Sequence, residues 1–218
     1  MKTNKTMTES SPPSEPKSAA NSKVANILDG ARRVFLADGF DGASMNDIAR
    51  AASVSKGALY IYFPSKVALF EALIRHDRQL QAEQLFQFDA EDEAPAQTLT
   101  RIGLGLMRAM CSADHLAHMR MVIGAVARHA SIGKAFFEAG PLAGAERLGA
   151  YLERLVAAAR LAPLDPLLAA DQFLQLCQSG YFKAALFCVA PPDDEVAIEK
   201  AVTDAVTAFL KTYAPERA

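Results

Sequence analysis

SMNDIARAASVSKGALYIYF, residues 44–63, predicts two short helices joined by a tight turn. Ser44 is a favourable N-cap, and Asp47 three residues later completes a capping-box pattern. Ser55 caps the second helix after the turn. This helix should stop before Pro64, because proline pushes the preceding residue out of the helical region. Such a pair is typical of the helix-turn-helix, whose second helix enters the major groove of DNA.

The second helix of this pair carries side chains that suit a surface close to DNA. Gly57 and Ala58 would let the backbone approach a groove, whereas Lys56, Tyr60 and Tyr62 could donate hydrogen bonds to phosphate oxygens. An ordinary amphipathic helix pair with a solvated lysine and solvated tyrosines is the alternative, because helix-turn-helix patterns have many false positives.

A dense, ordered set of residues extends this pattern on both sides: Gly39-Phe40, Ser44, Asp47-Ile48-Ala49, Val54-Ser55-Lys56-Gly57, Leu59-Tyr60, and Tyr62-Phe63-Pro64-Ser65-Lys66 with Leu69. This set resembles the N-terminal signature of TetR/AcrR-family transcriptional regulators. The resemblance implies an all-α protein with an N-terminal three-helix helix-turn-helix DNA-binding domain and a larger helical C-terminal domain for ligand binding and dimerisation. It also implies that Lys66 contacts the DNA backbone. The chain departs from the family at Val67, where an acidic residue is common.

The distribution of apolar residues divides the chain into three segments. Residues 1–22 are rich in Ser, Thr, Pro and Lys and hold almost no large apolar side chain, so we expect a disordered tail. Residues 23–66 form the expected DNA-binding domain, which opens with an apolar helical stripe and a helix end at Gly39. Residues 67–218 form the expected effector-binding and dimerisation domain. A long helix that starts at Ser65 links the two domains.

The larger domain is expected to hold helices near 96–111, 115–130, 133–160 with a break at Gly140-Pro141, 165–189, and beyond Asp193. Few charged side chains interrupt their faces, so a ligand pocket between them should be apolar. Methionine adapts to ligands of several shapes, and the pocket candidates are Met107, Met110, Met119, Phe136, Phe137, Phe173 and Phe182. Such side chains at helical spacing also fill ordinary cores, so both interpretations stay open.

The last two predicted helices carry more apolar surface than a single core needs. This excess suggests a helix-pair interface with a second copy of the chain across a two-fold axis, as the family resemblance also implies. The candidate interface residues are Leu174, Tyr181, Val202, Val206, Phe209 and Leu210.

Composition argues against several other classes of protein. With 218 residues, 51% of them hydrophobic, and a net charge of −2, the chain can build a sizeable core and is not globally disordered. Its three cysteines, an odd and sparse set, fit a reducing compartment better than a disulfide scaffold. No apolar run of transmembrane length and no signal-peptide core are present, so we expect a cytoplasmic protein without a membrane partner.

Catalytic, cofactor and metal sites are not expected. No nucleophile–base–acid spacing and no glycine-rich phosphate loop stand out, so we expect neither an enzyme nor a cofactor. His115 and His118 are three residues apart and could share a metal. Solvated or capping histidines are the simpler interpretation, because a metal site needs matched ligand geometry.

The sequence therefore predicts a ligand-responsive transcription factor, a repressor that binds a near-palindromic operator as a homodimer and is released by an apolar small molecule. The phosphates would be held by the helix start at Ser44 and by Tyr60, Tyr62 and Lys66. The predicted DNA-binding set also includes Ser55, which caps the helix that enters the groove, and the bases would face Lys56, Gly57 and Ala58.

Two other functions remain open at this stage. One is a helical carrier or enzyme for an apolar small molecule, without specific DNA binding. The other is a regulator without a small ligand, switched by oxidation of a cysteine or by a partner protein. Selection of a palindromic DNA sequence would favour the ligand-responsive regulator over the carrier.

Overall fold

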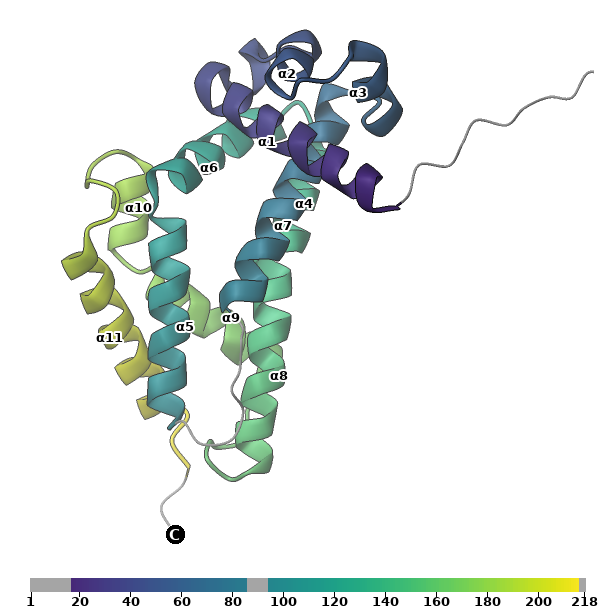
Figure 1. The fold of residues 1–218 in the computed structure, drawn as a ribbon. Coiled ribbons are helices and arrows are strands. Elements are labelled where there is room, and N and C mark those ends of the chain that lie inside the picture. The colour runs from purple at the N-terminus through teal and green to yellow at the C-terminus, as the bar shows by residue number, and fades with distance from the viewer. Residues whose placement is uncertain (1–16, 86–93, 216–218) are drawn as a thin grey trace, which may run out of the picture.

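The computed structural model describes residues 17–85 and 94–215, and every regular element within these ranges is helical. The N-terminal unit consists of α1 (Lys17–Gly42), α2 (Met45–Ala51) and α3 (Lys56–Tyr62), which lie together at one end of the molecule (Figure 1). The long helix α4 (Lys66–Leu85) leads from this unit into the larger part of the protein. The predicted all-α fold is confirmed.

The larger part of the protein consists of further helices and one π-helical turn. The turn, η1 (Glu138–Leu142), lies where the sequence predicts a helix break at Gly140-Pro141 and joins two helices end to end. The helices are α5 (Pro95–Met110), α6 (Ala113–Val126), α7 (Ala130–Phe137), α8 (Ala143–Ala157), α9 (Pro166–Cys177), α10 (Tyr181–Leu186) and α11 (Glu195–Thr212).

Two helix boundaries differ from the prediction. Helix α1 starts at Lys17, inside the segment predicted as a disordered tail, because Pro16 is the last helix breaker before it. The rest of that tail, residues 1–16, lies outside the described residues. The helix predicted over 165–189 instead ends at Cys177, and Gly180, with a φ of 83°, separates it from α10.

The end of α1 follows the local sequence as predicted. Gly39 has a φ of 72°, a left-handed conformation that interrupts the helix. The chain then turns back, and the Phe40 ring packs against Phe35 with their centroids 6.0 Å apart. Both rings also contact Phe70 of α4, so this turn fixes α1 against the linking helix.

The core consists of two apolar clusters. One fills the N-terminal unit and also includes Val122 and Ala125 of α6 and Ile132 of α7. The tip of the larger part is therefore built into the core of the N-terminal unit. The second cluster lies between α5, α8, α9 and α11. The domain boundary predicted at residue 66 therefore does not separate two independent cores, because side chains from both sides of it pack in the same cluster.

The residues predicted at a dimer interface lie in the core of a single chain, which corrects that assignment. Helix α11 packs on α5 and α9 of its own chain, so its apolar stripe faces inward. The buried members are Leu174, Tyr181, Val202, Val206 and Phe209, and Leu210 packs against them. An apolar stripe in the sequence predicts that one face of a helix is buried, but it does not predict whether its own chain or a second copy covers that face.

The described helices are too short or too polar to cross a bilayer singly. Only α3 and α4 together reach the required length and apolar character, and that pair is bent by 63°.

Candidate functional site

The two short helices of the N-terminal unit are capped as the sequence predicts. The Ser44 hydroxyl accepts a hydrogen bond from the Asp47 backbone N–H over 3.2 Å. The Ser55 hydroxyl accepts one from the Ala58 backbone N–H over 3.1 Å. Each cap satisfies a backbone donor that would otherwise lack a partner at the helix start. The start of each helix is therefore fixed by local sequence.

Helix α3 is anchored on one face and open on the other. Leu59 and Phe63 are buried in the N-terminal core. Lys56, Gly57 and Tyr60 are exposed. The other two predicted contact residues on this helix, Ala58 and Tyr62, are partly buried. The predicted DNA-contact residues of α3 therefore lie on a helix whose outer face is free for a ligand.

One exposed residue of α3 is not among those predicted to contact DNA. Ile61 is 81% exposed, which is unusual for a large apolar side chain. The signal was present in the sequence, because Ile61 lies off the face defined by the anchors Leu59 and Phe63. An apolar group on this face can contact a thymine methyl in the major groove.

Lys66 has intramolecular partners at the start of α4. Its Nζ donates to the backbone oxygens of Asp41 over 3.2 Å and Ala43 over 2.9 Å, and it lies 4.8 Å from the Phe40 ring centroid. From the sequence alone, an opposing phosphate accounts for a cation at this helix start. The carbonyls at the end of α1 supply a different reason, and contact of Lys66 with DNA stays a prediction.

Besides the shared core, two ion pairs and a ring contact join the N-terminal unit to the rest of the protein. Arg32 of α1 forms an ion pair with Asp77 of α4, and Arg128 after α6 forms one with Asp41. The Phe40 ring also meets the His129 ring edge-on, with 5.4 Å between centroids. These contacts connect α1 to α4 and to the α6–α7 turn.

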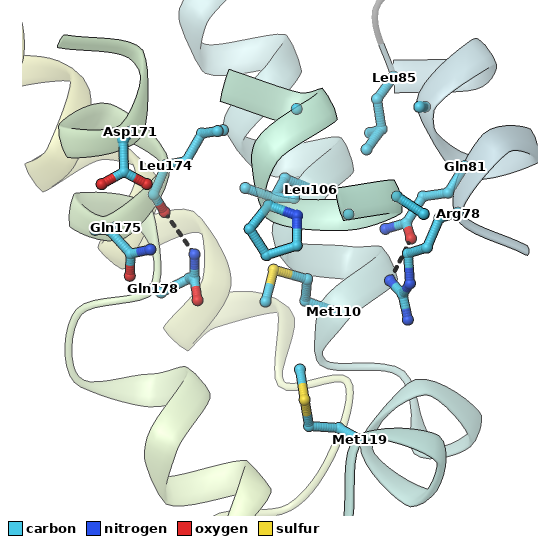
Figure 2. Close-up of a pocket in the computed structure, with 15 residues that line it drawn as sticks. Arg78, Gln81, Leu85, Leu106, Met110, Met119, Asp171, Leu174, Gln175 and Gln178 are labelled. Atoms are coloured by element: carbon cyan, nitrogen blue, oxygen red, sulfur yellow. Dashed lines mark hydrogen bonds between the residues drawn. The ribbon is translucent and has the colours of Figure 1, made fainter. Parts of the chain in front are cut away.

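A cavity lies between α4, α5, η1 and α9 (Figure 2). It contains about 760 Å³ of empty space, part of it open to solvent. Apolar side chains form much of the lining, including Leu85, Leu106, Met110, Met119 and Pro141. Polar and charged side chains from α4 and α9 complete it, namely Arg78, Gln81, Asp171, Gln175 and Gln178.

Only part of the predicted pocket set lines this cavity. Met110 and Met119 do so, whereas Met107, Phe173 and Phe182 are buried in the core. Phe136 lies beneath the Arg78 guanidinium, and Phe137 is 58% exposed. The expectation of a wholly apolar pocket is corrected as well, because polar residues of α4 and of the α9 segment face the same cavity.

Two histidines of α6 lie close to this cavity. Arg78 Nη2 lies 3.0 Å from His115 Nδ1, which therefore accepts a hydrogen bond. Burial lowers the pKa of His115 to about 3, and the neighbouring Arg78 and His118 contribute to this lowering. Burial also lowers the pKa of His118. No group of three or more metal-ligating side chains occurs among the residues that the structure describes.

Acid is expected to destabilise the fold through His115. The unfolded chain has an imidazole pKa near 6.5, so below that pH it takes up a proton that the folded chain does not accept until about pH 3. The free energy of unfolding should therefore fall by up to about 1.4 kcal/mol per pH unit in this window. Urea titrations between pH 7 and pH 5 measure this slope. His115→Asn should reduce this slope and leave the part that His118 contributes, and an unchanged slope in that variant would contradict the assignment.

Two models of known protein families match the chain. Residues 27–73 match the bacterial regulatory proteins of the tetR family, and residues 97–215 match the C-terminal domain of AefR-like transcriptional repressors. The second match alone covers more than half of the chain. The chain belongs to the TetR family. TetR-family regulators bind DNA, so this protein is a DNA-binding transcriptional regulator.

Solved structures of other regulators share the TetR-family fold over nearly the whole chain. The flavonoid-responsive regulator FrrA is 31% identical, with a TM-score of 0.71 over 90% of this chain and 100% of FrrA. A TetR-family regulator from Mesorhizobium loti is 23% identical, with a TM-score of 0.82 over 92% of this chain and 100% of that protein. At that identity the second comparison supports the fold alone.

A curated relative matches the chain over a shorter range. The HTH-type transcriptional regulator RutR of Escherichia coli K12 is 36% identical over 109 residues, which are 49% of this chain and 51% of RutR. The chain thus spans about half the length of this relative.

Proposed function

We propose that this TetR-family protein is a ligand-responsive repressor that acts in the cytoplasm and binds a near-palindromic operator as a homodimer. The observation that carries the proposal is the capped helix α3, which exposes Lys56, Gly57 and Tyr60 while Leu59 and Phe63 anchor it. The match to an AefR-like repressor domain supports repression. The flavonoid-responsive relative FrrA supports release by a small molecule.

Each α3 would enter a major groove with its exposed face toward the bases. We propose that Lys56, Gly57 and Ala58, which follow the cap Ser55, face bases, and that Ile61 adds an apolar contact. Phosphates would be held by the helix start at Ser44 and by Tyr60, Tyr62 and Lys66. The exposed positions of Lys56 and Tyr60 support this division.

The dimer interface is proposed on the outer side of the C-terminal helices rather than on their buried stripes. Several large apolar residues of this region remain exposed: Leu167, Leu168, Leu176, Phe187, Val189 and Val196. Exposed apolar groups of this kind are suited to contact with a second copy. A stable dimer would fix the distance between its two α3 helices, and therefore the spacing of the two operator half-sites.

Ligand release is proposed to act through α4 and the α6–α7 turn. The functional division remains a DNA-binding part, residues 23–66, and an effector-binding part, residues 67–218. Arg32–Asp77 and Arg128–Asp41 bridge the two parts. A ligand that favours one position of α4 would change the separation of the two α3 helices and so weaken DNA binding. By linkage, bound DNA would lower the affinity for that ligand by the same factor.

Selection from a pool of random duplexes at physiological salt tests the proposal. The expected result is enrichment of a near-palindrome whose half-sites are about one helical turn or slightly more apart. Weak, salt-sensitive binding without enrichment would reject the specific-operator proposal. Retained binding of small molecules in that case would favour the helical carrier.

Lys56→Ala is expected to weaken operator binding by about fivefold to a hundredfold, as loss of one base contact does. The reason is that Lys56 is exposed at the first position of α3. Fluorescence anisotropy with the selected operator at physiological salt measures the change. Lys211→Ala, which removes an exposed lysine from α11, is the matched control and should bind as the wild type does. Unchanged affinity in the Lys56 variant would show that α3 is not the recognition helix.

A further inference from the structure

The wall of the cavity contains a partly buried cation whose direct contacts are to uncharged side chains. Arg78 projects from α4 on the side opposite the α9 residues (Figure 2). Its Nη1 donates to Gln81 Oε1 over 2.8 Å, and its Nη2 donates to His115 Nδ1 over 3.0 Å. The guanidinium carbon lies 4.9 Å from the centroid of the Phe136 ring. None of these three contacts neutralises the positive charge.

The described residues provide no ion-pair partner for Arg78. Its sequence neighbour Asp77 is engaged with Arg32 of α1. Burial lowers the pKa of Arg78 to about 10, while Asp77 acts to raise it, so the side chain stays charged at neutral pH. A desolvated cation without a paired counter-ion is unfavourable, and an anion placed beside it would offset that penalty.

Two buried hydrogen-bond donors, one on Arg78 and one on the His115 ring that it contacts, also lack partners. Arg78 Nε is buried and has no hydrogen-bond partner among the described residues. Because His115 Nδ1 accepts from Arg78, the proton of the neutral ring lies on Nε2, which is likewise buried without a partner. A buried donor without an acceptor costs about 1–3 kcal/mol. Arg78 lines the cavity, so a ligand acceptor that reached its Nε would remove this cost there, whereas His115 lies behind Arg78 and is not a lining residue.

The remainder of the cavity suits a ligand whose middle part is apolar and whose end opposite Arg78 is uncharged. Leu106, Met110 and Met119 lie between Arg78 and the α9 side chains (Figure 2). On α9, Gln178 Nε2 donates to the Leu174 backbone oxygen over 2.9 Å, which leaves the Gln178 side-chain oxygen as an acceptor. Asp171 carries a negative charge on that side and would repel a second anion.

We propose that the cavity binds an amphipathic monoanion, a carboxylate on an aromatic or aliphatic body, with its oxyanion on Arg78. The inference deepens the proposed function and rests on it, because it names the chemical class of the effector. A guanidinium matches the two oxygens of a carboxylate with parallel hydrogen bonds, which gives both affinity and orientation. The effector is thus apolar in its body and charged at one end.

The position of Arg78 also places the anion next to a contact that orients the DNA-binding unit. Arg78 follows Asp77 directly on α4, and Asp77 holds Arg32 of α1. A ligand carboxylate on Arg78 brings negative charge beside this ion pair. Binding at the cavity and the orientation of α1 therefore meet at adjacent residues of one helix.

The experiment compares carboxylates with their uncharged amides. Isothermal titration calorimetry of the full-length protein at pH 7 uses 4-phenylbutyrate, 2-naphthoate and octanoate, each with its primary amide. At least one carboxylate should bind more tightly than its amide by about tenfold or more, a difference of about 1.4 kcal/mol. Arg78→Gln should remove the preference without weakening the amide. Arg75→Gln, which alters an exposed arginine one turn earlier on α4, is the control and should retain it.

Each outcome decides the proposal. Equal affinity of every acid and its amide, or no binding by any of the three carboxylates, would overturn it. A preference that persists in a folded Arg78→Gln variant would also overturn it. If that variant does not fold, the acid-to-amide ratio of the wild type decides alone. Failure to select an operator sequence would reject the proposed repressor function instead. That outcome does not depend on the ratio of acid to amide affinities, so the two failures can be told apart.

Discussion

Replacing Gly57 with leucine is expected to preserve the fold and reduce operator affinity by about a hundredfold. A Cβ atom at Gly57 would meet no atom within 4 Å outside its sequence neighbours and the backbone of its own helix, and the residue is exposed on α3. The free protein therefore has room for a larger side chain. On DNA, the same side chain would hold the α3 backbone away from the groove and break two or more base contacts, each of which contributes about 1–3 kcal/mol.

A second exposed glycine provides the control. A Cβ atom at Gly124 in α6 would likewise meet no other atom within 4 Å, so Gly124→Leu makes the same chemical change away from α3. Both variants should melt at or above the temperature of the wild type, because glycine weakens a helix interior by about 0.5–1 kcal/mol. Only Gly57→Leu should lose the operator in an anisotropy titration. Loss in both variants, or in neither, would contradict the proposed orientation of α3.

Local features of this fold could be predicted because each depends on a few neighbouring residues. The caps at Ser44 and Ser55 and the helix end at Gly39 need only the residues within one turn. The same holds for the stripe of α1. For this reason the helix-turn-helix could be derived from one short stretch of sequence.

The dimer assignment shows where such reasoning ends. Val202 and Phe209 lie on a clear helical stripe, and the stripe is buried. Which surface buries it depends on how α11 packs against α5 and α9, helices that are far away in the sequence. The long-range packing, and not the periodicity, decides between an intramolecular core and an interface.

Arg78 was missed for a related reason. In the sequence it is one of several charged residues on a helix that also holds Arg75 and Asp77, and all three fit a solvated face. In the folded protein, Arg75 and Arg78 have different surroundings. Arg75 is exposed and pairs with Glu71, whereas Arg78 points into a cavity formed by α5, η1 and α9. The candidate effector site is therefore defined by helices that only the tertiary structure brings together.

Replacing Gly30 with alanine is expected to destabilise the N-terminal unit by about 3 kcal/mol, at the upper end of the usual range for overpacking. A Cβ atom at Gly30 of α1 would lie 2.7 Å from the backbone nitrogen of Ala52 and 2.8 Å from its Cα. These are backbone atoms at the end of α2, so no side-chain rotation relieves the clash. Helices α1 and α2 would have to separate, which would displace α3 from its position for DNA binding.

Urea unfolding and operator binding together test this close contact. In an open helical position such as Gly124, the change from glycine to alanine should be neutral or stabilise the protein by up to about 1 kcal/mol. Gly124→Ala is therefore the control for the change in helix propensity. Amide hydrogen exchange should accelerate in α1 and α2 of Gly30→Ala, with α9 and α11 less affected because their cluster is separate. A Gly30→Ala variant with stability within about 0.5 kcal/mol of the wild type would show that α1 and α2 can separate without penalty.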